Sequence, residues 1–259
     1  MADIGWSGLA ISLLLVGVVI GLSMWRGLGL ERSIAWATAR ALVQLVAVGL
    51  ALQVLLRPDT SLAWSALWVL GMIVFAAETV RRRAREVPHV FPLALAAFGA
   101  SAVVVLGILF GFGVFELDAR TLIPLAGLMI GNSMTATVLV ARRLVEELRD
   151  KRAEVEARLA LGQPSSDAAV PYVRAALRTA LVPQIETTKA VGLIFLPGAM
   201  TGLILAGVDP LDAVRVQAAV MFVVLASAAT TTAVVVLGVR RRLFTADHRL
   251  VRLERSAEP

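Results

Sequence analysis

Seven apolar runs, each close to the length of a transmembrane helix, constrain the fold of this chain more than any other feature. About 20 residues of α-helix cross the roughly 30 Å hydrocarbon core of a bilayer. Inside that core a chain satisfies its backbone hydrogen bonds internally, which favours helices. We therefore expect an all-α, polytopic membrane protein in which residues 1–259 form one transmembrane domain. The runs cover residues 9–25, 34–56, 62–80, 90–112, 122–140, 191–206 and 213–239.

Composition supports a membrane location. Hydrophobic residues make up 58% of the chain, above the roughly 45–50% that is usual in soluble proteins. The absence of cysteine from the sequence excludes disulfides and thiolate metal sites. The first run follows Asp3 and lacks a basic segment before it, so we interpret it as a retained span. We expect a multi-pass protein of the inner (plasma) membrane.

Basic residues lie at alternate ends of the runs. The connections after the first, third, fifth and seventh runs are rich in arginine, whereas the opposite connections hold only Arg57, Arg120 and Arg215. Because cytoplasmic loops accumulate Lys and Arg, this pattern predicts an N-terminus outside and a basic cytoplasmic tail at 240–259. The net charge of +6 follows from this topology. Nucleic-acid binding is not expected, because no aromatic side chains are interleaved with these arginines.

A polar insert at residues 142–189 separates the fifth and sixth runs. Glu147 precedes Lys151 by four residues, a spacing that supports a helix in water. Gly162 can end this helix, and a second helix is expected to run toward Pro183. We interpret the insert as a helical, cytoplasmic docking surface for a soluble partner. The alternative is a pair of solvated helices with no partner.

The chain has no nucleotide-binding P-loop. Such a loop needs a Gly-Lys pair to hold phosphates, and neither of the two lysines, Lys151 and Lys189, follows a glycine. Any ATP and Mg²⁺ used for transport would therefore be handled by a separate polypeptide. We expect this chain to bind no cofactor itself and not to be an enzyme.

Several motifs form a distinctive pattern along the chain. They are IPLAG at 123–127, GNSM at 131–134, KAVGL at 189–193, LPGAMTG at 196–202 and AGVDP at 206–210. Together with Arg40 and Gln44 in the second run, they resemble the FetB family of iron-export ABC permeases. This resemblance covers nearly the whole chain.

The resemblance implies a permease that works with a separate ATP-binding subunit, forms a homodimer and exports a metal ion, iron in bacterial members. Plant relatives tied to aluminium tolerance or nucleotide-sugar transport imply a non-metal substrate as an alternative. Likeness to the coupling loop of bacterial ABC permeases places the contact with the ATPase at Glu156, Ala157, Leu161 and Gly162. A stand-alone secondary transporter and a non-transporting scaffold remain the alternatives from other classes.

Polar side chains within the apolar runs are candidates for a substrate pathway, because burying them in lipid is costly. In the fifth run, Asn132 and Ser133 lie near Met129 and Met134, so oxygen and thioether ligands are both present. The alternative is that these polar groups bond only to their own helix. No cluster has the spacing of a strong metal site, so the metal ligands are not assigned.

Two more polar positions are candidates for the pathway. Gln44 lies one helical turn from Arg40, and the alternative is an arginine that snorkels to the interface. Glu78 lies near the end of the third run. It either attracts cations to a vestibule or pairs with Arg81 and Arg82.

The entry to the sixth run is a candidate gate. Glu186 and Lys189 are spaced to pair, and Pro197 with Gly198 interrupts the run that follows. Broken helices are tolerated where they line cavities or pack against neighbours. We expect a hinge at Pro197 and Gly198 that moves when the ATPase acts on the insert. The alternative is a local ion pair at the interface.

Pairs of glycines four residues apart predict close helix packing, because small residues let backbones approach each other. They are Gly17 with Gly21, Gly107 with Gly111, Gly127 with Gly131 and Gly198 with Gly202.

Overall fold

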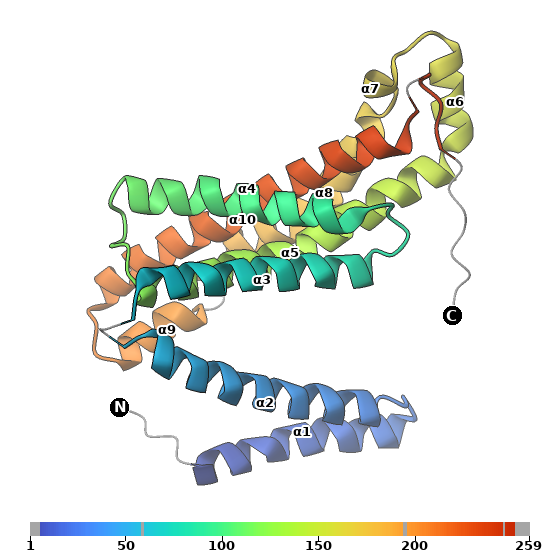
Figure 1. Cartoon of the computed structure of the whole chain (residues 1–259). Helices are drawn as coiled ribbons and strands as arrows, with labels where there is room; N and C mark the ends of the chain where they lie inside the picture. The colour runs from blue at the N-terminus through green and yellow to red at the C-terminus, as the bar shows by residue number, and fades with distance from the viewer. Residues whose placement is uncertain (1–5, 58–59, 194–195, 246, 252–259) are drawn as a thin grey trace. The chain divides into compact units, whose positions relative to one another are not determined.

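The fold is entirely helical in the part of the chain that the computed structural model describes, residues 6–57, 60–193, 196–245 and 247–251. Ten helices form there, and Phe244 pairs with Leu250 in an isolated antiparallel β-bridge. The prediction of an all-α chain is confirmed. The helices (Figure 1) are α1 (Trp6–Arg26), α2 (Glu31–Leu55), α3 (Leu62–Arg83), α4 (Val90–Gly111), α5 (Ala119–Asp150), α6 (Arg152–Ala160), α7 (Ser165–Ala168), α8 (Val170–Ala190), α9 (Gly198–Leu205) and α10 (Pro210–Leu243).

Five of the described helices are long and apolar enough to cross a membrane by their length and composition, namely α2, α3, α4, α5 and α10. The apolar part of α1, Ala10–Arg26, is shorter. Each of these six helices coincides with one of the apolar runs. The number of spans and the orientation of the chain stay predictions.

Two compact units divide the chain. One comprises Met1–Ser61 with Leu205–Gly207, and the other comprises Leu62–Ile204 with Val208–Pro259. In the first unit α1 and α2 form a hairpin, whose turn is closed by a hydrogen bond of 2.8 Å from Ser23 Oγ to Glu31 Oε1. None of the residues of α2 is buried within the chain.

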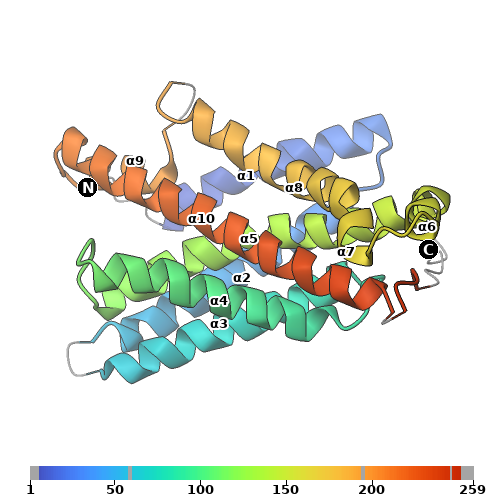
Figure 2. The same cartoon turned by 90° about the horizontal axis from the view of Figure 1, so that it is seen from above.

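The core of the second unit lies around α10 and α5. Helix α10 packs against α5, α4 and α8, while α3 packs against α4 and α5 (Figure 2). Phe98, Met129, Val235 and Val236 are buried where these helices meet. Inside a bilayer the lipid is as apolar as these side chains, so close van der Waals packing holds such helices together.

Helix α5 is longer than its apolar run. It begins at a capping box, in which Asp118 accepts a hydrogen bond of 2.6 Å from the backbone N–H of Ala119. Its 32 residues span about 48 Å at 1.5 Å per residue, more than the hydrocarbon core of a bilayer. The helix therefore continues from the fifth run into the insert, as predicted.

The sixth run differs from its prediction. Helix α8 passes through Pro183 without a break and ends only at Ala190. A proline removes only one backbone donor, and packing against neighbouring helices can keep the helix continuous. Gly192 then adopts a φ of 86°, a left-handed conformation that ends helices. The shorter helix α9 follows. The run 191–206 is therefore not one helix, and Gln184 to Lys189 belong to α8.

The predicted glycine pairs do not make close contacts within the chain, with one exception. A Cβ atom added at Gly127 would lie 3.1 Å from Met72 Cε. At the other seven glycines it would meet nothing within 4 Å. The tightest approach is instead at Gly238 of α10, where the side chain of Leu93 from α4 occupies the space. These pairs therefore leave open faces on α1, α4, α5 and α9.

The segment after α10 folds back onto the insert. Arg152 of α6 donates hydrogen bonds to the backbone oxygens of Leu250 and Val251, at 3.2 and 3.3 Å. His248 Nδ1 lies 2.9 Å from Ser165 Oγ at the start of α7. The basic tail predicted at 240–259 begins within α10, and residues 252–259 lie outside the described part of the chain.

Candidate functional site

A pocket of about 290 Å³ lies between α5, α8, α9 and α10 in the second unit. Helices α5, α8 and α10 contribute side chains three or four residues apart, so one face of each turns to the pocket. The polar residues that line it are Asn132 from α5, Gln184, Thr187 and Thr188 from α8, and Gln217 from α10. Of the described residues that line the pocket, none carries a formal charge.

Asn132, Thr187 and Thr188 each donate a side-chain hydrogen bond to the backbone oxygen four residues earlier in their own helix. Thr187 Oγ1 donates to Pro183 O at 2.9 Å, and Thr188 Oγ1 donates to Gln184 O at 2.8 Å. Asn132 Nδ2 likewise donates to Leu128 O at 2.8 Å. Because the hydroxyl protons are used within the helix, the oxygen lone pairs remain as acceptors.

Gln217 differs from the other polar residues of this pocket. Its side chain is only 6% exposed, and its Oε1 has no hydrogen-bond partner in the described structure. An unpaired buried polar atom costs about 1–3 kcal/mol. Sequence reasoning missed this residue, although Gln217 is the one amide within the apolar run 213–239.

The residues predicted around Asn132 separate in the structure. Asn132 lines the pocket, but Ser133 is buried and donates to Met129 O at 2.7 Å. Met129 is fully buried in the core, and Met134 packs against that core. Adjacent residues of a helix point about 100° apart, which explains why Asn132 and Ser133 face different surroundings.

The predicted gate and hinge also separate. Pro197 and Gly198 line the pocket at the start of α9. Glu186 and Lys189 do not line it, and they pair with each other at 2.9 Å with both side chains more than half exposed. The local ion pair described as the alternative is thus present.

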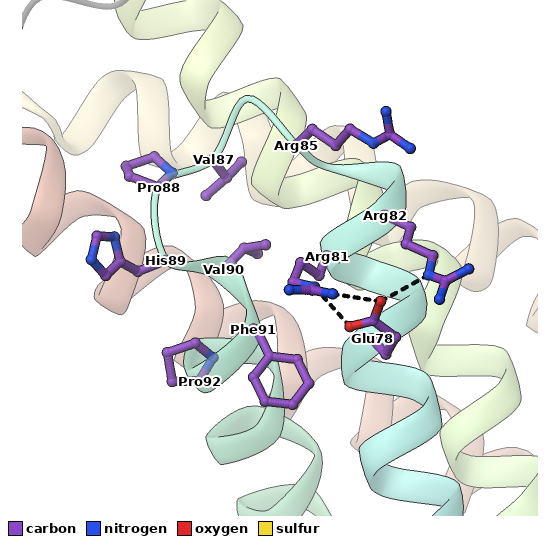
Figure 3. Close-up of a pocket in the computed structure, with 10 residues that line it drawn as sticks. All are labelled: Glu78, Arg81, Arg82, Arg85, Val87, Pro88, His89, Val90, Phe91 and Pro92. Atoms are coloured by element: carbon purple, nitrogen blue, oxygen red, sulfur yellow. Dashed lines mark hydrogen bonds and ion pairs between the residues drawn. The ribbon is translucent and has the colours of Figure 1, made fainter.

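Glu78 lies in a different pocket, formed by the end of α3 and the connection to α4. Its carboxylate contacts Arg81 at 2.7 Å and Arg82 at 2.8 Å, and Figure 3 shows both guanidinium groups turned toward it. This pocket of about 740 Å³ is also lined by Arg85 and His89. The structure therefore brings Glu78 together with arginines and not with Asn132.

Gln44 and Arg40 lie on α2 in the first unit, where both side chains are exposed. Neither has a hydrogen bond or ion pair with another described residue of the chain. A polar pair on an otherwise apolar helix needs a partner or an interface in a membrane.

The residues predicted to contact an ATPase lie on the insert and at its tip. Glu156 forms an ion pair of 2.6 Å with Arg152, and Ala157 and Gly162 are exposed. Leu161 is 85% exposed. A large apolar side chain at an exposed tip is available to a partner.

A buried charge lies within the insert, where α5 ends. The carboxylate of Glu147 is buried and contacts Arg143 at 2.6 Å and Lys151 at 2.9 Å. Lys151 Nζ also lies 5.7 Å from the centre of the Tyr172 ring of α8. In α6, the guanidinium of Arg158 lowers the pKa of Glu154 by a hydrogen bond. These contacts join α5, α6 and α8.

No group of three or more His, Cys, Asp or Glu side chains that could hold a metal ion occurs among the described residues. The pocket that Asn132 lines is uncharged, and its polar side chains offer oxygen atoms as hydrogen-bond acceptors.

The described residues form apolar helices, five of them long enough to cross a membrane, and a pocket lies between α5, α8, α9 and α10. The chain belongs to the family described as "Uncharacterised protein family (UPF0014)", whose model matches residues 6–244. It is therefore a multi-pass membrane protein of this family.

Three relatives show the breadth of the family. The chain is 32% identical over 243 residues to the Escherichia coli (strain K12) "Probable iron export permease protein FetB", covering 94% of this chain and 93% of that protein. It is 41% identical over 206 residues to "UPF0014 membrane protein STAR2" of Oryza sativa subsp. japonica, covering 80% and 72%. It is 35% identical over 212 residues to "Protein ALUMINUM SENSITIVE 3" of Arabidopsis thaliana, covering 82% and 77%. No solved structure matches the chain. The predicted likeness to the FetB family is confirmed.

Proposed function

We propose that this chain is the transmembrane permease subunit of an ABC transporter that exports a metal ion, iron being the leading candidate. A separate subunit hydrolyses ATP with Mg²⁺. The observation that carries the proposal is the uncharged polar pocket around Asn132 and Gln217, within a chain similar over 94% of its length to a protein named as an iron export permease. Seven spans and a cytoplasmic insert are part of the proposal.

The pocket has the properties of a transport site. A site for conduction must bind well enough to admit its solute and weakly enough to release it. Oxygen acceptors without a carboxylate fulfil both conditions for a cation, because they replace some of its water but do not hold it by charge. Pro197 and Gly198 line the same pocket, which supports a hinge beside the solute in this proposal.

Coupling to ATP hydrolysis is assigned to the tip of the insert. The exposed side chain of Leu161 lies beside Gly162, whose φ of 86° closes the turn after α6. A soluble ATPase would bury this leucine. The ion pairs of Glu147 behind it would transmit movement from the insert to α5.

A second copy of the chain is the partner that we assign to α2. Arg40 and Gln44 are exposed on a helix that buries nothing within its own chain. In a homodimer these polar groups would face protein and not lipid, where a central charge costs about 2.5–3.5 kcal/mol.

Two alternatives remain for the substrate and energy source. The similarity to plant proteins admits an ABC permease for a non-metal substrate such as a nucleotide sugar. A stand-alone secondary transporter of a metal ion or small solute is the other alternative. It requires groups in the spans that couple a driving ion.

The decisive experiment measures ATP-dependent uptake of iron(II) into inverted vesicles that contain the chain, with and without a co-expressed ATP-binding subunit. We expect uptake only when both proteins are present. A Leu161→Asp variant should lose binding of the ATPase, and Val251→Asp, at an exposed position of the predicted cytoplasmic tail, serves as the control. Uptake that persists without any ATPase would favour the secondary transporter. ATPase activity stimulated by another solute, without iron uptake, would remove iron as the substrate.

A further inference from the structure

The pocket at the end of α3 is positively charged. Three arginines line it, Arg81, Arg82 and Arg85, together with one carboxylate, that of Glu78. With His89 neutral, three arginines and one carboxylate give the lining a formal charge of +2. The volume of about 740 Å³ lies within the roughly 300–1,000 Å³ that is usual for small-molecule sites. This charge and size favour an anionic ligand.

Arg85 has no hydrogen bond or ion pair with another described residue. The neighbouring carboxylate, that of Glu86, forms its ion pair with Arg142 of α5, at 2.7 Å. Glu78 contacts Arg81 and Arg82, and Figure 3 shows no contact between the guanidinium of Arg85 and the other residues drawn. All of the N–H donors of this guanidinium are therefore available to a ligand.

Glu78 leaves donors free on the other two arginines as well. It accepts from Nε and one terminal nitrogen of Arg81, but only from Nε of Arg82. A guanidinium has five N–H donors in a planar fork that matches phosphate oxygens. Arg81 also lies over the ring of Phe91 in α4, 5.9 Å from its centre. Contacts thus hold these guanidinium groups in place without using all of their donors.

The connection between α3 and α4 forms a fixed wall of the pocket. His89 has a φ of 53°, a left-handed conformation that is uncommon for a residue other than glycine. Arg242 of α10 donates a hydrogen bond of 2.6 Å to the backbone oxygen of His89. Val87 and Val90, on either side, are buried. Because an unusual backbone conformation persists only where surrounding contacts hold it, this wall does not need a ligand in order to form.

The surroundings of the pocket favour a lipid over a free anion. Phe91 and Pro92 line it beside the arginines. Val74 and Phe75 are exposed on α3, about one turn before Glu78. An acyl chain attached to the anion can follow this apolar surface into the third run. The arginines lie at the end of that run, on the predicted cytoplasmic side, where basic pockets between membrane helices bind anionic head groups.

We propose that this pocket binds the phosphate head group of an anionic phospholipid in the predicted cytoplasmic leaflet. Arg85 and the free donors of Arg82 contact the phosphate oxygens. Glu78 moderates the affinity, because it competes with the phosphate for Arg81 and Arg82. The bound lipid ties the connection between α3 and α4 to the membrane surface. This inference goes beyond the proposed function and does not depend on the transported solute.

The test is native mass spectrometry of the full-length, detergent-purified chain, titrated with phosphatidylglycerol and with phosphatidylcholine of the same acyl chains. We expect saturable binding of phosphatidylglycerol. Arg85→Gln should weaken it by about tenfold, the effect of one lost hydrogen bond to a charged group. Arg178→Gln, at an exposed position of the predicted cytoplasmic insert, is the matched control and should leave it unchanged.

A second variant gives a change of the opposite sign. Glu78→Gln removes the negative charge that competes for Arg81 and Arg82, so it should bind phosphatidylglycerol more tightly than the wild type. A variant that only disturbed the fold would bind the lipid more weakly, and this result would contradict the role of Glu78. Thermal unfolding of each variant reports on its stability. The midpoint of Arg85→Gln should match that of the wild type, because Arg85 has no partner in the described structure.

Several outcomes would overturn the inference. One is equal affinity of Arg85→Gln and the wild type for phosphatidylglycerol. Equal weakening in Arg85→Gln and Arg178→Gln would show general attraction to a basic surface, and equal binding of the two lipids would show that the charge of the head group has no effect. Inorganic phosphate is the second probe. If it binds and phosphatidylglycerol does not, the ligand is a soluble anion. ATP-dependent iron(II) uptake tests the proposed function separately from all of these outcomes.

Discussion

Glu147 is the one charged side chain that is buried in the described part of the chain. Its carboxylate forms ion pairs with Arg143 and Lys151, whereas the ion pair between Glu186 and Lys189 is exposed to solvent. Exposed ion pairs contribute little to stability, because water screens them and the side chains lose entropy. A buried carboxylate is different, since losing its charge leaves two cations without their shared partner.

We predict that Glu147→Gln lowers the thermal midpoint of unfolding by about 2–4 °C. The reason is that the amide retains the shape but not the charge that holds Arg143 and Lys151. Glu186→Gln is the matched control and should shift the midpoint by less than about 1 °C. Thermal unfolding of the detergent-purified chain measures both. Equal shifts in the two variants would show that burial of Glu147 has no energetic consequence.

For these residues the sequence predicted the ion pair but not its burial. The four-residue spacing of Glu147 and Lys151 predicted their ion pair, and the structure confirms it. The spacing could not predict that Glu147 is buried and Glu186 is not. Burial depends on which helix face meets another element, and α8 meets α5 around Tyr172 and Lys151.

At the scale of elements, α10 and α4 approach most closely at Gly238. A Cβ atom there would enter the space of the Leu93 side chain. The residue follows three valines and does not form a small-residue pair of the kind that sequence reasoning used. Apart from Gly127, the glycines of the predicted pairs have no neighbour within 4 Å. The close packing of α10 on α4 therefore could not be predicted from such pairs.

We predict that Gly238→Leu destabilises the fold by about 1–3 kcal/mol, the usual cost of overpacking. Leu93 would have to leave its position, and α4 would shift away from α10. Gly107→Leu, on α4 with nothing within 4 Å, is the matched control and should be close to neutral. Chemical unfolding of both variants in the same detergent measures the difference. A Gly238→Leu variant as stable as the wild type would show that α4 moves without cost.

Helix α8 also follows a different path from the one predicted. A proline and a glycine both act as helix breakers in sequence, but Pro183 lies inside α8 whereas Gly192 follows its end. Helix α8 packs on α5 and α10, and its buried residues, Tyr172, Ala176 and Ala180, precede the proline. This continuation carries Gln184, Thr187 and Thr188 to the pocket of Asn132.

For the whole molecule, the free face of α2 argues for assembly. The proposed homodimer would cover Arg40 and Gln44, which nothing in the first unit covers. The sequence has no cysteine, so single cysteines can report on proximity without a background. Disulfides form only when two Cα atoms come within about 7 Å.

We predict that a Gln44→Cys variant, oxidised in native membranes, gives a covalent dimer of twice the 27.5 kDa mass of the chain. The expectation follows from a second copy seated on α2. Val103→Cys is the control, at a position of α4 that is 75% exposed but apolar. Non-reducing electrophoresis measures the product. Cross-linking at both positions alike, or at Val103→Cys alone, would contradict the assignment of α2 to the interface.

The sequence by itself determined the helical class, the family and six of the helices that coincide with apolar runs. These properties are local, because the length of an apolar run and the spacing of charges follow from neighbouring residues. The sequence also indicated Asn132, as a polar residue in an apolar run, and Pro197 with Gly198, as a break in a helix. Their roles remain proposals.

Only the tertiary structure decided which of these residues meet. It brought Gln217 from α10 and the threonines of α8 to Asn132, and it set Glu78 and Glu186 apart from that pocket. The physical reason is that a pocket forms where the faces of several helices converge, and that convergence depends on the rotation of each helix in the packed unit. No local pattern in the sequence specifies this rotation.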